Sequence, residues 1–165
     1  MILSIILLMV VAASLVLKLD SNYLYVVPFC IAPIILKAFF DTRIAIFTHL
    51  IAILIIGFIV PKDFVFEFVF LQLIAGIVSI LTVLKMYKRS QLFISVAKVI
   101  VVYFVIYVSF SITHDGSLID IDFGILIQLA ISGGLTLFAY PTIFLFEKIF
   151  SLISDVSLLE LTDTN

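Results

Sequence analysis

Six mostly apolar segments follow one another along the chain, separated by short polar breaks. Each has about 17–24 residues, which as a helix approaches the ~30 Å thickness of the hydrocarbon core of a bilayer. Membrane-spanning β-strands would have about 10 residues with alternating polarity, and this chain shows neither feature. The sequence therefore predicts an all-α polytopic bundle of about six transmembrane helices. The predicted spans are 2–17, 23–40, 44–60, 64–84, 92–112 and 123–146.

The composition excludes a soluble globular domain. Hydrophobic residues make up 65% of the 165 residues and charged residues 12%, against about 45–50% and 25% in soluble domains. The formal net charge is −2 and the only basic run is a short loop, so the lipid bilayer is an expected partner and nucleic acid is not. The single Cys30 permits no internal disulfide and is interpreted as a small apolar residue of a helix.

Lysine and arginine are distributed unequally between the two sides of the predicted bundle. The side that carries the termini holds six of the nine basic residues, the opposite side holds Lys18 and Lys62, and Lys98 lies within the fifth span. Because cytoplasmic loops are enriched in these residues, both termini are predicted to be cytoplasmic. The residues that set this topology are Arg43, Lys85, Lys88 and Arg89.

The two ends of the chain give expectations about what adjoins the bundle. Met1 leads directly into apolar residues without a charged region or a convincing cleavage site, so no signal peptide is expected. Ser157 and Glu160 match a capping box, which marks the start of a helix. A helix of little more than two turns is not stable alone in water, so we expect a further domain to follow. We divide the chain into a membrane domain, 1–146, and a cytoplasmic linker, 147–165.

Polar side chains within spans are costly and are therefore candidates for function. Lys98 either reaches back to the cytoplasmic headgroups with its long stem or binds an anionic ligand or partner inside the bundle. His49 is either a hydrogen-bonded structural residue or a proton or metal site, although no second His, Cys or carboxylate stands three or four positions away. Gln128 is a candidate ligand or coupling residue, with a contact between helices as the alternative.

Small residues and prolines mark places where helices approach or bend. Gly133 and Gly134 in the sixth span favour close approach of another helix, with a hinge as the functional alternative. Pro28 and Pro33 in the second span, and Pro141 in the sixth, interrupt helical hydrogen bonding and are expected to kink their helices. The candidate hinge is therefore Gly133, Gly134 and Pro141.

The sequence contains no constellation that would carry catalysis. It has no P-loop, no nucleophile elbow and no His and Cys pattern with metal-binding spacing. His114 and Asp115 form a His-Asp pair, but this pair lies in a short loop predicted to be outside, with no further histidine nearby. We expect no catalytic, cofactor-binding or metal-binding residue in this chain.

Three segments stand out by their order and spacing. A proline-bearing segment, 22–28, leads to the turn F-D-T-R at 40–43, the basic loop reads K-R-S-Q-L at 88–92, and 146–165 joins the last span to the predicted helix. Together they resemble the bacterial seven-transmembrane HD-domain phosphohydrolases, whose members degrade cyclic di-AMP. The similarity covers nearly the whole chain.

This resemblance implies an architecture. Relatives carry an N-terminal anchor and an extracytoplasmic domain, then a seven-span block, then a cytoplasmic HD domain whose His and Asp ligands hold two metal ions. The present chain would be the seven-span block without its first span. None of the catalytic residues of the family has a counterpart in it, so the implied divalent metals (Mn or Fe) and the hydrolysis belong to the HD domain of the full-length protein.

Three functions are compatible with the sequence. The first is a membrane sensory and anchoring domain that binds an unknown small ligand or responds to the extracytoplasmic domain, and controls the HD domain through the last span and linker. The second is a passive anchor that holds the HD domain at the membrane, as a homodimer. The third is a small-solute transporter or channel subunit, although no internal repeat supports it. We favour the first.

Overall fold

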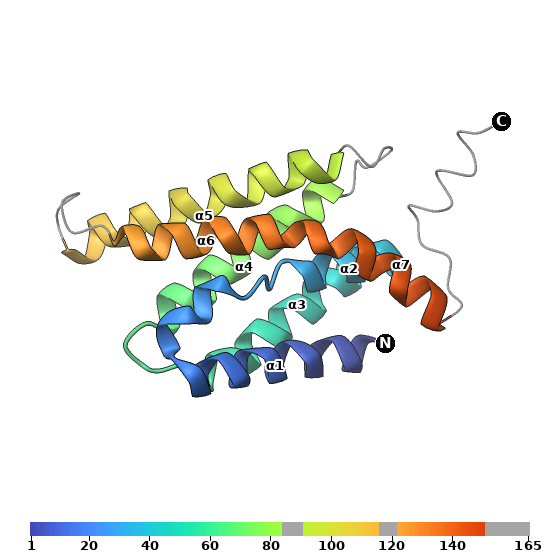
Figure 1. Ribbon diagram of the computed structural model, residues 1–165, viewed down its shortest axis with the longest axis horizontal. Helices are drawn as coiled ribbons and strands as arrows, with labels where there is room; N and C mark the ends of the chain where they lie inside the picture. The colour runs from blue at the N-terminus through green and yellow to red at the C-terminus, as the bar shows by residue number, and fades with distance from the viewer. Residues whose placement is uncertain (84–90, 116–121, 151–165) are drawn as a thin grey trace.

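The computed structural model describes residues 1–83, 91–115 and 122–150, and the regular elements within these ranges are all helices. Figure 1 shows them gathered into one elongated bundle, which confirms the predicted all-α architecture. In chain order the elements are α1 (Ile2–Leu19), the 3₁₀ helix η1 (Ser21–Val26), α2 (Ile31–Phe39), α3 (Thr42–Gly57), α4 (Val65–Val83), α5 (Gln91–Asp115), α6 (Phe123–Leu135), the 3₁₀ helix η3 (Thr136–Phe138) and α7 (Ala139–Phe150).

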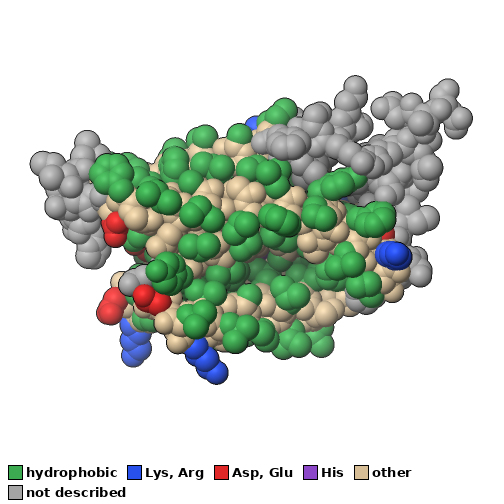
Figure 2. Space-filling model, in the orientation of Figure 1, with side chains coloured by type: hydrophobic (Ala, Val, Ile, Leu, Met, Phe, Trp, Pro, Cys, Tyr) green, Lys and Arg blue, Asp and Glu red, His purple; other side chains and the backbone are tan. Residues whose placement is uncertain are grey.

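The helical segments have the lengths and surfaces of membrane spans. Two shorter apolar segments, Tyr23–Phe39 and Thr42–Gly57, complete a set of six in the described residues. Figure 2 shows hydrophobic side chains over the long middle of the bundle, with charged side chains toward its ends. This distribution fits a protein that crosses a bilayer. Four segments are long and apolar enough to cross alone, namely Ile2–Leu19, Val65–Val83, Ile94–Thr113 and Phe123–Ile149.

The second predicted span is two helical segments with a break between them. η1 ends at Val26 and α2 begins at Ile31, with Pro28 in the break. Proline has no amide hydrogen and drives the preceding residue away from the helical conformation, so the helix cannot continue through this point. The carbonyl oxygen of Val27 accepts a hydrogen bond of 3.0 Å from the Ser132 hydroxyl of α6. The interruption is therefore fixed by a neighbouring span.

The other two prolines differ in their effect. Pro33 is the third residue of α2, and amide hydrogens in a first turn have no partner within the helix, so proline fits there without a kink. The expected kink at Pro33 is wrong for this reason. Pro141 is the third residue of α7 and follows the short η3. Figure 1 shows α7 turning away from the direction of α6 at this junction.

α4 packs against α2, α3 and α5 and lies at the centre of the core. Its Phe68 is fully buried, and its ring meets those of Tyr25 and Phe29 edge-to-face at centroid distances of 6.1 and 5.5 Å. Such edge-to-face pairs stabilise a core beyond the area they bury. The small residues Ala75 and Gly76 are also buried and let neighbouring helices come close.

The two adjacent glycines of α6 have different surroundings. A Cβ atom at Gly133 would overlap the Ile100 side chain of α5, whereas a Cβ atom at Gly134 would meet no atom within 4 Å. Gly133 therefore permits the close approach of α5 and α6, and Gly134 does not take part in it.

Replacing Gly133 by alanine should destabilise the bundle by about 1–3 kcal/mol, because α5 and α6 must move apart. Gly134→Ala is the matched control and should leave stability unchanged or raise it by up to about 1 kcal/mol, since alanine is the better helix former. Unfolding of the purified chain by SDS or heat in a mild detergent measures both effects. Equal stability of the two variants would contradict the close contact at Gly133.

Candidate functional site

Four buried side chains form a polar cluster inside the bundle. They are Cys30 at the start of α2, His49 of α3, Gln72 of α4 and Tyr103 of α5, and each is at most 1% exposed. The Tyr103 hydroxyl donates a 2.9 Å hydrogen bond to Gln72 Oε1 and lies 3.1 Å from Cys30 Sγ. Because the tyrosine proton is used on Gln72, the Cys30 thiol donates to the tyrosine oxygen. One hydroxyl thus joins three helices.

His49 adds α3 to this polar cluster. Its Nε2 lies 3.0 Å from the backbone carbonyl oxygen of Gln72. Since a carbonyl oxygen only accepts hydrogen bonds, Nε2 carries a proton. A Cβ atom at Gly76 would overlap the imidazole ring. The glycine therefore creates the space in which His49 reaches the backbone of α4.

Two atoms of the polar cluster, His49 Nδ1 and Gln72 Nε2, are buried and have no hydrogen-bond partner in the described part of the chain. A buried polar atom left in this state costs about 1–3 kcal/mol. An arrangement of side chains that pairs either atom would regain some of that energy. Within the described residues, this cluster therefore has hydrogen-bonding capacity that its present arrangement does not use.

The last span is irregular where it meets the polar cluster. α6 gives way to η3 at Thr136, and the Thr136 hydroxyl donates to the Ser132 carbonyl oxygen at 3.1 Å. The Ser132 hydroxyl donates to the Val27 carbonyl oxygen and lies near the Tyr103 hydroxyl. The broken second span, the polar cluster and the broken last span are therefore connected through Ser132.

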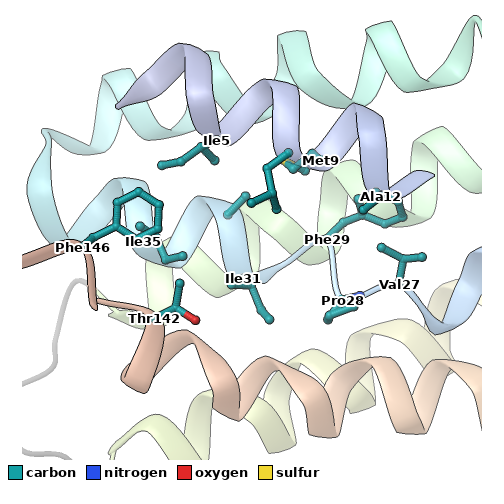
Figure 3. A pocket seen from close by; sticks show the side chains of 12 residues that line it. Ile5, Met9, Ala12, Val27, Pro28, Phe29, Ile31, Ile35, Thr142 and Phe146 are labelled. Carbon is teal, nitrogen blue, oxygen red and sulfur yellow. The ribbon is translucent and has the colours of Figure 1, made fainter. Parts of the chain in front are cut away.

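An apolar pocket of about 320 Å³ lies between α1, the break of the second span, α2 and α7. Figure 3 shows Ile5 and Met9 of α1 on one side and Thr142 and Phe146 of α7 on another. The Thr142 hydroxyl donates a hydrogen bond of 2.6 Å to the Phe138 carbonyl oxygen. The pocket therefore offers an almost purely hydrocarbon wall, and any occupant would touch α7.

The structure places the predicted polar candidates apart from one another. His49 belongs to the polar cluster, and Lys98 is exposed on α5. Gln128 lies near the start of α6 and lines a cavity at that end of the bundle. Arg43 is exposed in the first turn of α3. The other topology-setting residues, Lys85, Lys88 and Arg89, lie outside the described residues. The ligand, coupling and topology roles stay predictions.

The candidate hinge residues lie on both sides of η3. Gly133 and Gly134 precede it and Pro141 follows it. A short 3₁₀ segment within a helix has poorer hydrogen-bond geometry and often marks a point of bending. The hinge role of these residues stays a prediction. The helix predicted from Ser157, and most of the linker 147–165, lie outside the described residues.

Two residues of the polar cluster were missed by the sequence analysis. Cys30 was interpreted as a small apolar residue. Tyr103 is one of six tyrosines, and its own neighbours in sequence are apolar. A usable signal exists for Tyr103. It lies midway along the predicted span 92–112, whereas tyrosines in membrane proteins favour the two interfaces.

Together the helical bundle and its apolar belt define a polytopic membrane protein. The family model described as 7TM receptor with intracellular HD hydrolase matches residues 1–154. This chain belongs to that family, as the resemblance in its sequence predicted. Neither the comparison with curated proteins nor the comparison with solved structures gave a match.

Tyr103→Phe should destabilise the bundle by about 1–2 kcal/mol, because Cys30 and Gln72 both lose their partner in an apolar interior. Tyr23→Phe is the matched control, since Tyr23 is 57% exposed on η1 and its change should have little effect. Thermal unfolding in detergent compares the two variants with the parent chain. An undiminished stability of Tyr103→Phe would show that the hydroxyl makes no net contribution.

Proposed function

We propose that this chain is the membrane sensory domain of an HD phosphodiesterase that degrades cyclic di-AMP. The observation that carries the proposal is the family match over residues 1–154, whose description pairs a seven-transmembrane receptor with an intracellular HD hydrolase. Cyclic di-AMP as the substrate comes from the resemblance in three segments of the sequence. The distribution of Lys and Arg supports both termini inside, and the cytoplasmic membrane of a bacterium comes from the same resemblance.

The signal reaches the HD domain through α6, η3 and α7. Three features support this route: Ser132 fastens α6 to the break at Val27, η3 interrupts the span, and α7 lines the apolar pocket with Thr142 and Phe146. A change in the polar cluster or in the apolar pocket therefore shifts α7 relative to α2 rather than being absorbed by a straight rigid helix. α7 leads into the linker 147–165, which would connect it to the HD domain.

Hydrolysis itself is assigned to the HD domain of the full-length protein. The divalent metal ions (Mn or Fe) held there would supply an activated water for attack on the phosphodiester. In the described residues of this chain, no group of three His, Cys, Asp or Glu side chains is placed to hold a metal ion. The work of these residues is to hold the helices and to transmit their displacement.

Leucine at Gly133 and Gly134 should change the rate of cyclic di-AMP hydrolysis by the full-length protein in membranes by about 5-fold or more, in line with typical coupling energies. The physical reason is that both substitutions enlarge α6 next to η3. Ile131→Leu, on an exposed face of α6, is the control and should leave the rate unchanged. The assay measures product release from cyclic di-AMP in membranes that contain equal amounts of each variant.

An unchanged rate and an unchanged response to growth conditions in the glycine variants would contradict transmission through α6. A second experiment then decides between sensor and passive anchor. If residues 1–146 are replaced by an unrelated membrane anchor and regulation survives, the bundle only holds the enzyme at the membrane. Loss of regulation with retained hydrolysis supports the sensory role.

A further inference from the structure

The apolar pocket beside α1 extends along that helix (Figure 3). The residues of α1 that line it recur at helical spacing and form one stripe, namely Ile5, Leu8, Met9 and Ala12. At ~1.5 Å per residue, this stripe is about 10 Å long. The pocket therefore runs parallel to the spans, which is the direction that acyl chains take in a bilayer.

The depth of the pocket corresponds to one leaflet. Figure 3 shows Phe146 beside Ile35 at one end of the pocket and Pro28 near the other. The 9 residues of α2 rise about 14 Å, roughly half of the ~30 Å hydrocarbon thickness, so the break lies near the midplane. By the Lys and Arg distribution, the half that contains the pocket lies in the cytoplasmic leaflet.

The backbone of the break, which forms one wall, is paired. The Phe29 amide donates to the Val27 carbonyl oxygen at 2.9 Å, and the Ile31 amide donates to the Pro28 carbonyl oxygen at 3.1 Å. The Ala32 amide donates to the Phe29 carbonyl oxygen at 3.3 Å. Broken membrane helices bind polar substrates through backbone groups that the helix leaves unpaired. This break instead presents hydrocarbon to the pocket.

The side chains of the lining also offer no unpaired polar group. Thr142 carries the one hydroxyl among the described lining residues, and its proton is used on the Phe138 carbonyl oxygen. A buried water molecule needs about two to four polar partners, which this lining does not provide. Sugars, nucleotides and ions would lose their hydration without replacement. The occupant that suits the pocket is therefore a hydrocarbon.

The pocket is continuous with the surface of the bundle that faces lipid. Leu8 lines the pocket and is 65% exposed. It belongs to an exposed apolar face of α1, which also includes Leu3, Leu7, Val11 and Leu15. Lipid tails are as apolar as this face and lie against it. An acyl chain can therefore enter from the side without passing through water.

The volume of the pocket suits a single chain. An apolar cavity of ~150 Å³ holds one benzene molecule, so the about 320 Å³ of this pocket has room for roughly twelve carbon atoms. This is a large part of one acyl chain and too little for two chains side by side.

We propose that the apolar pocket holds one acyl chain of a phospholipid from the cytoplasmic leaflet. The chain lies between α1 and α7, against Met9, Ile31 and Phe146. As the ligand of the sensory domain it rests on the proposed function, whereas its binding does not. Because the chain separates α7 from α1, a change in the acyl chains of the membrane would displace α7. The lipid itself would then be the signal.

A single introduced tryptophan can report on the pocket, because the chain contains no Trp. Phe146→Trp places the indole in the wall of the pocket, and Phe144→Trp, at a position 64% exposed on the same helix, is the matched control. Phosphatidylcholine with bromine in the middle of its acyl chains is titrated into each variant in mild detergent. Fluorescence quenching should saturate at equimolar lipid in Phe146→Trp and continue to rise in Phe144→Trp.

Two further measurements locate the chain. Ala12→Phe fills the pocket from α1 and should raise the lipid concentration for half-maximal quenching of Phe146→Trp by about 10-fold or more. Ala97→Phe, at an exposed position of α5, is the control and should leave that concentration unchanged. Dodecane should compete with the brominated lipid and phosphocholine should not, because the pocket recognises the chain and not the headgroup.

Three results would overturn the proposal. Quenching of Phe146→Trp that rises without saturation would show that the pocket only touches bulk lipid. An absence of quenching would show that another part of the protein covers the pocket. Competition by phosphocholine and not by dodecane would assign recognition to the headgroup. The titration and the competition decide even if Ala12→Phe fails to fold. The glycine variants of α6 test the proposed function separately, since hydrolysis is not measured in the quenching experiments.

Discussion

The structure depends on one constraint, which is that a backbone polar group in hydrocarbon must find its partner within the protein. Helices meet this demand along nearly all of each described span. The two places where a span is interrupted, at Pro28 and at η3, are packed on each other. The Ser132 hydroxyl donates a hydrogen bond to the carbonyl oxygen of Val27, and the Thr136 hydroxyl donates one to the carbonyl oxygen of Ser132. Irregular backbone is thus confined to a contact between two spans, where protein groups replace the missing water.

The same demand explains the buried polar cluster. Hydrocarbon gives helices little reason to choose one neighbour over another, so polar contacts and small residues set the arrangement. The Tyr103 hydroxyl joins α2, α4 and α5, and His49 reaches α4 because position 76 has no side chain. Because this cluster touches the broken last span through Ser132, the contacts that hold the bundle also connect its interior to α7. Under the proposed function, stability and signal transmission would therefore use the same residues.

The sequence predicted the features that follow from length and polarity. The six spans were predicted because each apolar run matches the thickness of a bilayer. An interruption at Pro28 was predicted, as a kink, because proline removes a hydrogen bond from the interior of a helix. Pro33 was misjudged because its effect depends on where the helix begins, which only packing determines. The pairing of Cys30 with Tyr103 was missed because 73 positions separate them and neither is unusual in its neighbourhood. The cavity at Gln128 could not be predicted, since residues from several spans line it.

The account requires that the end of the bundle where α4 begins faces outward and that α7 ends on the cytoplasmic side, and cysteine accessibility tests this directly. Cys30 is fully buried and gives little background. A cysteine at Lys62 and one at Ile149, introduced separately, are exposed to a membrane-impermeant maleimide in intact cells and after permeabilisation. The account predicts that position 62 is labelled in intact cells and position 149 only after permeabilisation. The reverse pattern would place the end of α7 on the side opposite to the HD domain and contradict the proposed direction of signalling.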